Sequence, residues 1–317
     1  MIKQNFRSFI CGLKGQKLLR KEIIFLKKYK PWGVILFSRN IKTITQTQNL
    51  TKSIKKIFKN DNYPILIDEE GGRVSRLRKF IDNSIFSAKY FGDMFYKDRK
   101  KFNIYFNVYI KQISYLLRLL GININTVPVL DLRRMDSHNI IGDRSYSDNK
   151  NVISIISDIC IDSFHKNRIA TVIKHIPGHG LSKVDSHKKL PVINKNIKYL
   201  NNNDFKVFKN KRSIFSMTGH LLFTKIDNKN TVTHSSKIIN IIRKRIGFKN
   251  LIITDDLSMK ALNYTIEENT KKSFKAGCNL ALHCNGNLSE MIKVAKNSPK
   301  INKFILKKTS QFVKIIS

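Results

Sequence analysis

Short apolar runs rich in β-branched residues recur along the whole chain. Such runs are typical of strands buried on both faces in a parallel sheet. Eight of them predict eight strands: Phe6–Leu13, Gly33–Phe37, Pro64–Asp68, Ile122–Asp131, Ala170–His175, Ser213–His220, Leu251–Asp256 and Asn279–Cys284.

Longer segments with helical spacing lie between these runs. Examples are Gln16–Tyr29, Ile44–Phe58, Ile104–Leu120, Val152–Lys166, Ser236–Ile246 and Ile266–Ala276. This alternation predicts an α/β protein, either a (β/α)8 TIM-type barrel or a doubly wound sheet. No glycine fingerprint follows the first run, which argues against a nucleotide-binding sheet. Since no Pro-, Gly- or Ser-rich linker and no repeat divides the chain, we expect one barrel domain over residues 1–317.

Charged and polar residues close several of the predicted strands. In a parallel barrel, the carboxyl ends of the strands all face one crater, where barrel enzymes keep their chemistry. We therefore expect the following side chains to gather there: Asp68-Glu69-Glu70, Asp131, Lys174-His175, His220 and Asp255-Asp256.

The charge balance is strongly basic, with 60 Lys and Arg against 22 Asp and Glu and a formal net charge of +38. A polyanion partner would explain this charge. However, the basic residues are spread along the chain, and no nucleic-acid-binding signature accompanies them. The chain is also rich in residues with A/T-rich codons, so we attribute the charge to genome composition and expect no specific nucleic-acid partner.

The four cysteines, Cys11, Cys160, Cys278 and Cys284, are far apart and form no metal-ligand spacing. The apolar stretch near the N-terminus is too short for a signal-peptide core. No run approaches the roughly 18 apolar residues that span a bilayer. We therefore expect a monomeric, cytoplasmic protein with no membrane partner.

The densest group of chemically active residues is Lys174-His175-Ile176-Pro177-Gly178-His179-Gly180, followed by Asp185-Ser186-His187. Its proline and glycines predict a loop that leaves the strand and can move. Asp185 and His187 are two residues apart, so an extended backbone places both side chains on one side, where the carboxylate can orient the imidazole. Such a dyad can donate and accept a proton near neutral pH.

Two other interpretations of these histidines remain open. His175, His179 and His187 could bind Zn²⁺ together with Asp185, although their spacing matches no recognised zinc motif. They could also be polar loop residues without a chemical role.

Two further groups carry paired charges. Asp255 and Asp256 end a buried strand, where one of them can cap the following helix and the other is left for chemistry. Asp68 and Arg76 flank a glycine-containing turn in which a carboxylate could accept from sugar hydroxyls and a guanidinium could donate, although a salt-bridged turn is the alternative. Arg144 follows a turn from which it could reach the crater.

These stretches together resemble family-three glycoside hydrolases, in particular the cytoplasmic β-N-acetylhexosaminidases of bacterial cell-wall recycling. KHIPGHG followed by DSH is the most specific match. The matching segments occur in family order: Gly33–Asn40, Ile67–Arg76, Ile141–Ser145, Lys174–His187 and Ile253–Met259.

The resemblance implies a retaining β-N-acetylglucosaminidase that needs no cofactor or metal. Asp255 would be the nucleophile, His187 the acid/base, and Asp185 its orienting partner. The residues implied to hold the sugar are Asp68, Arg76, Arg144, Lys174 and His175. The implied substrate is N-acetylglucosaminyl-β-1,4-1,6-anhydro-N-acetylmuramic acid, with or without its peptide.

Two rival functions stay open. A histidine acid/base would also admit phosphate, so a phosphorylase on the same fold is one alternative. The other is a catalytically inactive barrel that binds polyanions through its positive charge.

Overall fold

Eight parallel strands close into a barrel in the computed structural model, which describes residues 2–134, 141–186 and 188–317. The strands follow the order β1-β10-β9-β7-β5-β4-β3-β2 around the barrel, and every neighbouring pair is parallel. Their bounds are β1 Arg7–Gly12, β2 Pro31–Leu36, β3 Ile65–Ile67, β4 Ile124–Asn125, β5 Ala170–Ile176, β7 Phe215–Thr218, β9 Leu251–Asp256 and β10 Leu280–His283. Each lies within or overlaps one of the eight predicted runs, so the barrel is confirmed and the doubly wound sheet is excluded.

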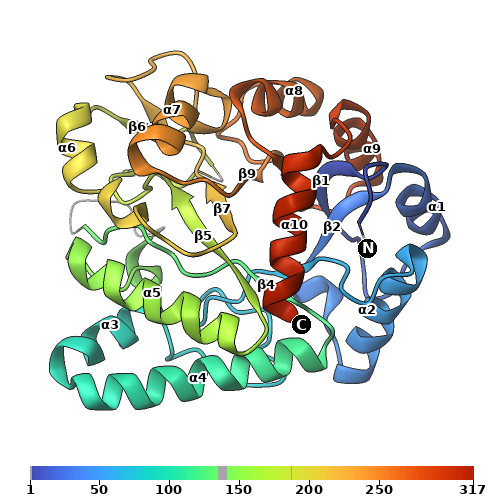
Figure 1. Ribbon diagram of the computed structural model, residues 1–317, viewed down its shortest axis with the longest axis horizontal. Helices are drawn as coiled ribbons and strands as arrows, with labels where there is room; N and C mark the ends of the chain where they lie inside the picture. The colour runs from blue at the N-terminus through green and yellow to red at the C-terminus, as the bar shows by residue number, and fades with distance from the viewer. Residues whose placement is uncertain (1, 135–140, 187) are drawn as a thin grey trace.

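Helices surround the barrel (Figure 1). Those that match the named segments are α1 Arg20–Tyr29, α2 Ile44–Phe58, α4 Arg99–Leu119, α5 Lys150–Lys166, α7 Ser236–Ile241 with a π-helical turn over Ile242–Ile246, and α8 Ile266–Ala276. Four more are present: α3 Ala88–Lys97, α6 Ile197–Asn202, α9 Leu288–Asn297 and α10 Lys303–Ile316. A small parallel pair, β6 Val192–Ile193 and β8 Leu222–Phe223, lies outside the barrel.

Side-chain caps explain where several helices begin. The Thr43 hydroxyl accepts a hydrogen bond from the backbone N–H of Gln46, which fixes the start of α2. Thr265 and Glu268 form a capping box at the start of α8. α1 begins at Arg20, later than predicted, because Glu22 accepts from the backbone N–H groups of Leu19 and Lys14 and holds the preceding residues in a turn.

The strands of the barrel are almost entirely buried. All six residues of β2 and all seven of β5 are buried. Burial on both strand faces favours apolar side chains on either side, which is why most of the runs are rich in apolar residues.

The amino end of the barrel is closed by α10. Trp32, at the start of β2, packs with its ring centroid 5.4 Å from that of Phe215 at the start of β7 and 6.2 Å from that of Phe312 in α10. The Trp32 indole N–H donates to the Thr309 hydroxyl at 2.9 Å, and both side chains are buried. α10 crosses this end of the barrel (Figure 1), so the carboxyl end is left for the site.

None of the helices in the described part of the chain combines the length and the apolar character that crossing a membrane requires.

Replacing Thr309 with Val should lower the free energy of unfolding by about 1–3 kcal/mol, because the shape is kept while the buried Trp32 N–H loses its acceptor. Urea unfolding followed through the fluorescence of Trp32, the single tryptophan of the chain, measures the change. Ser310→Ala, an exposed hydroxyl one residue further along α10, is the matched control. Equal unfolding midpoints for the two variants would contradict the importance of this hydrogen bond.

Candidate active site

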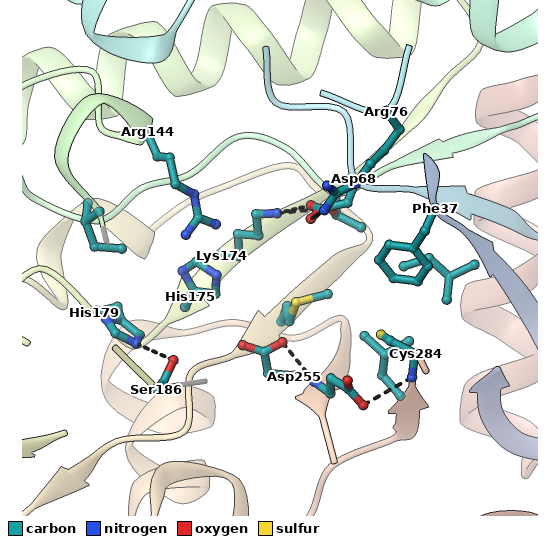
Figure 2. Close-up of a pocket in the computed structure, with 16 residues that line it drawn as sticks. Phe37, Asp68, Arg76, Arg144, Lys174, His175, His179, Ser186, Asp255 and Cys284 are labelled. Carbon is teal, nitrogen blue, oxygen red and sulfur yellow. Dashed lines mark hydrogen bonds and ion pairs between the residues drawn. The ribbon is translucent and has the colours of Figure 1, made fainter. Parts of the chain in front are cut away.

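A cavity of about 160 Å³ opens at the carboxyl end of the barrel. Six of the eight residues predicted for the site line it: Asp68, Arg76, Arg144, Lys174, His175 and Asp255. Figure 2 shows Arg144, Lys174, Asp68 and Arg76 along one side of the cavity and Asp255 with Cys284 on the other. The remaining two are Asp185, which lies in the neighbouring loop, and His187, which lies outside the described residues.

Lys174 is a buried charge at the centre of the site, with its side chain 2% exposed. It projects from β5, and its Nζ lies 2.5 Å from Asp68 Oδ1, 2.6 Å from Glu70 Oε1 and 3.0 Å from Thr126 Oγ1. A buried ammonium is costly unless it is paired, and here two carboxylates and a hydroxyl surround it. The contacts join β5 to the segment that follows β3.

Two arginines complete this charge network. Arg76 Nη2 lies 3.0 Å from Asp68 Oδ2, and Arg144 binds Glu70 with both Nε (2.7 Å) and Nη2 (2.8 Å). Burial alone would raise the pKa of Asp68, but Lys174 and Arg76 outweigh it and hold that pKa well below its usual range. Burial opposes ionisation of Glu70 in the same way, and Arg144 and Lys174 lower its pKa. Both carboxylates are therefore ionised at neutral pH.

The role of Glu70 was missed by the sequence analysis, although its position carries a signal. Asp68 and Glu70 are two residues apart and both contact Lys174, as expected for side chains on one face of an extended segment. Glu69 points elsewhere and is buried, where it accepts from the backbone N–H groups of Arg76 (2.6 Å) and Leu77 (3.0 Å). Glu69 thus fixes the turn that carries Arg76, and burial raises its pKa.

Asp131 organises the two described histidines of the site. Its Oδ2 lies 2.6 Å from His175 Nδ1, and its Oδ1 accepts from the backbone N–H of His179 at 2.6 Å. Burial opposes the charge on Asp131, but His175 outweighs it and lowers the pKa of the carboxyl group. The contact places the Nδ1 proton of a neutral His175 toward Asp131 and leaves Nε2 as the other polar atom of the ring. Burial, with a contribution from His175, lowers the pKa of His179 to about 4, so that ring is neutral at pH 7.

The two acidic residues at the end of β9 have different surroundings. Asp256 accepts from the Ser258 hydroxyl (2.8 Å) and from the backbone N–H groups of Ser258 and Cys284 (both 3.1 Å). The backbone oxygen of Asp256 lies 3.0 Å from His220 Nε2. Both residues line the cavity, but the Asp256 carboxylate is bound to the turn after β9, while Asp255 lies between His175 and Cys284 (Figure 2).

The loop after β5, which we call the His loop (residues 178–186), forms one wall of the cavity. Its two glycines are required: a Cβ at Gly180 would lie 2.3 Å from the backbone oxygen of Leu132, and Gly178 has a φ of +137°. His179 and Ser186 both line the cavity, and their Nε2 and Oγ atoms are 3.4 Å apart. The backbone of Asp185 accepts from Lys188 and Lys189. This end of the loop thus carries Ser186, the residue directly before His187, into the cavity wall.

The family model described as the glycosyl hydrolase family 3 N-terminal domain matches residues 12–312. The chain belongs to glycosyl hydrolase family 3. Curated relatives within this family are named beta-hexosaminidase. The relative from Haemophilus ducreyi is 31% identical, and the match covers 87% of this chain and 80% of the relative. The relative from Methylobacillus flagellatus is 29% identical, and the match covers 86% of this chain and 78% of the relative. The chain is thus a family 3 glycoside hydrolase related to the β-hexosaminidases.

Solved family 3 structures superpose closely on this barrel. NagZ from Neisseria gonorrhoeae in complex with a zinc ion has a TM-score of 0.85 and 25% identity, covering 97% of this chain and 90% of that protein. The same protein in complex with N-trifluoroacetyl-D-glucosamine has a TM-score of 0.81 and 24% identity, covering 99% of both chains. The N-trifluoroacetyl-D-glucosamine complex therefore has the same fold as this chain.

No group of three or more His, Cys, Asp and Glu side chains within residues 2–134, 141–186 and 188–317 could hold a metal ion. The zinc interpretation of His175 and His179 would need His187, which lies outside the described residues.

Replacing Asp131 with Asn should lower the glycosidase kcat/KM by about 10- to 100-fold, as is typical when the residue that orients a functional histidine is lost. The amide can still accept from His179, but its NH2 group then faces His175 and disfavours the Nδ1-protonated tautomer. Steady-state kinetics at pH 7 measure the loss, and the exposed Asp61→Asn is the matched control. Unchanged kinetics in Asp131→Asn would show that this tautomer does not matter.

Proposed function

We propose that this family 3 enzyme is a retaining β-N-acetylglucosaminidase acting on small peptidoglycan fragments. The observation that carries the proposal is the arrangement around the 160 Å³ cavity, where the Asp255 carboxylate lies opposite the paired groups of Asp68, Lys174 and Arg144. A nucleophile opposite a set of fixed donors suits a single sugar ring. The relatives named beta-hexosaminidase and the N-trifluoroacetyl-D-glucosamine complex of the gonococcal protein support an acetamido sugar.

The sugar is held by Asp68, Arg76, Arg144, Lys174 and His175 in this proposal. Charge-assisted hydrogen bonds are about twice as strong as neutral ones, and the donors here are already oriented by Asp68, Glu70 and Asp131. The site therefore loses little conformational entropy when the sugar binds. The Asp68 carboxylate, ionised at neutral pH, accepts from sugar hydroxyls.

The reaction proceeds in two displacements. The Asp255 carboxylate attacks the anomeric carbon and forms a covalent glycosyl-enzyme, while the protonated His187 imidazole gives its proton to the leaving oxygen. The neutral His187 then removes a proton from water as the water attacks the anomeric carbon and releases Asp255. The two inversions retain the β configuration of the released sugar.

Asp185 orients His187 and stabilises its protonated form. Retaining enzymes ordinarily use a second carboxylate for proton transfer. A neutral imidazole in this place adds no negative charge beside Asp255 during the second displacement. Ser186, the residue before His187 in the sequence, lines the cavity, which supports the assignment of His187 as the acid/base.

The physiological substrate in this proposal is N-acetylglucosaminyl-β-1,4-1,6-anhydro-N-acetylmuramic acid, with or without its peptide, and the setting is cell-wall recycling in the cytoplasm. The protein acts as a monomer. The closed barrel and its surrounding helices support one catalytic domain over residues 1–317.

Wild-type protein should hydrolyse a chromogenic β-N-acetylglucosaminide and leave the corresponding β-glucoside almost untouched. Asp255→Ala and His187→Ala should each lower kcat by at least about 100-fold, because each removes a group that reacts in both steps. Release of the chromophore measures turnover, and product analysis with and without phosphate separates hydrolysis from phosphorolysis. A wild-type protein that hydrolyses neither sugar would refute the proposal.

Asp185→Ala tests the dyad separately. Without the carboxylate, the protonated imidazole of His187 is less stable, so the basic limb of the kcat/KM profile should move to lower pH by about one unit. Asp148→Ala, which removes an exposed carboxylate elsewhere, is the control. An unchanged pH profile in Asp185→Ala would mean that Asp185 does not orient the acid/base.

A further inference from the structure

A second cavity of about 340 Å³ lies on the other side of the His loop, and we call it the loop pocket. His179 and Ser186 line the central cavity, whereas Leu181 and Lys183, between them in the sequence, line the loop pocket. The same short loop is therefore a shared wall. The residues that line the loop pocket are Arg134, Leu181, Lys183, Val192, Ile193, Asn194 and Lys195.

We propose that the loop pocket binds the carboxylate of the aglycone, the part of the substrate that leaves the central cavity. The inference rests on the proposed function, since it concerns the sugar or peptide attached to the N-acetylglucosamine. The enzyme should then prefer anionic to neutral aglycones, and Arg134, Lys183 and Lys195 are the residues that give it this preference.

The charges of the loop pocket favour an anion. Among the described residues, seven line the loop pocket, of which three are cations and none is acidic. Arg134 and Lys195 both lie over the ring of Tyr199, with their charged groups 5.8 Å and 5.2 Å from its centroid, so both cations contact the same aromatic side chain. Because Asp204 pairs with Arg134, the positive potential that attracts a carboxylate comes mainly from Lys183 and Lys195.

The base of the pocket is fixed by a buried ion pair. Arg134 Nη2 lies 2.9 Å from Asp204 Oδ2, and the Asp204 side chain is 1% exposed. Asp204 also packs behind the His loop, because a Cβ at Gly178 would lie 2.8 Å from its Cβ. The pair therefore anchors the guanidinium to the same layer that supports the loop, and Lys183 and Lys195 supply the exposed cations at the rim.

The apolar residues of the loop pocket restrict which anions it can bind. Leu181, Val192 and Ile193 provide aliphatic surface, and the Val192 side chain is 55% exposed although it belongs to β6. A ligand that buries methyl groups against these residues and presents a carboxylate to the lysines fits this combination. The lactyl ether of muramic acid and a short peptide attached to it both have that chemistry.

The test compares two disaccharides that differ only in the lactyl group. N-Acetylglucosaminyl-β-1,4-N-acetylmuramic acid carries the carboxylate, and N-acetylglucosaminyl-β-1,4-N-acetylglucosamine lacks it. The double variant Lys183→Gln/Lys195→Gln should lower the ratio of kcat/KM on the acidic to the neutral substrate by about tenfold at low salt. The difference should shrink as salt is raised, because both lysines are exposed.

The matched control is Lys21→Gln/Lys27→Gln, which makes the same charge change at exposed positions of α1, far around the barrel from β6 (Figure 1). It should keep the wild-type ratio. A ratio that is equal in both double variants and the wild type would overturn the loop pocket while leaving the proposed function intact. A wild type that cleaves neither disaccharide would instead refute the proposed function.

Free anions form a separate arm of the experiment. Added acetate should compete with the acidic disaccharide in the wild type more than in the Lys183→Gln/Lys195→Gln variant. The contrary result has two parts: acetate changes turnover of the neutral disaccharide in the wild type but not in the lysine variant, and the ratio of kcat/KM on the two substrates stays constant. The pocket then holds a free anion, and the aglycone assignment is wrong.

Discussion

The buried ammonium of Lys174, held between the carboxylates of Asp68 and Glu70, is the contact on which the site depends. It joins β5 to the segment after β3, and those two carboxylates in turn hold Arg76 and Arg144. Removing one partner of such a group leaves an uncompensated buried charge, which typically costs about 3–5 kcal/mol. The network is therefore stable only when all its members are present, and this fixes the geometry of the sugar-binding side before any ligand arrives.

The opposite side of the cavity is built differently. The Asp256 carboxylate accepts hydrogen bonds from the turn after β9 and from Cys284, and its neighbour Asp255 lies beside the cavity. Asp131 joins the His loop to β5, because its carboxylate contacts both His175 in β5 and the backbone at the start of the His loop. The strand that presents a sugar-binding histidine and the loop that leads to the proposed acid/base thus share one carboxylate. A change in the position of the loop would therefore alter the contact between Asp131 and His175.

Glycines and buried pairs explain why the His loop can serve two cavities. Gly180 allows the loop to touch the backbone of Leu132, and Asp204 supports Gly178 from behind. With its first residues held in this way, the loop turns His179 and Ser186 to one side and Leu181 and Lys183 to the other. The strong positive charge of the chain then has a local consequence at the loop pocket, even if genome composition produced most of it.

The sequence by itself determined the barrel and most of the residues around its cavity. Strands buried on both faces are mainly apolar, and the polar residues at their carboxyl ends meet at one edge of the barrel, so Asp68, Lys174 and Asp255 were predictable from local pattern. Resemblance was needed to choose Asp255 over Asp256 as the nucleophile, because both end the same strand. Only the tertiary structure decided which charges pair. Glu70 with Arg144, Asp131 with His175, and the closing of the barrel floor by Trp32 and α10 join residues 74, 44 and 277 positions apart. Contacts over such separations depend on how the barrel closes, and no local pattern encodes them.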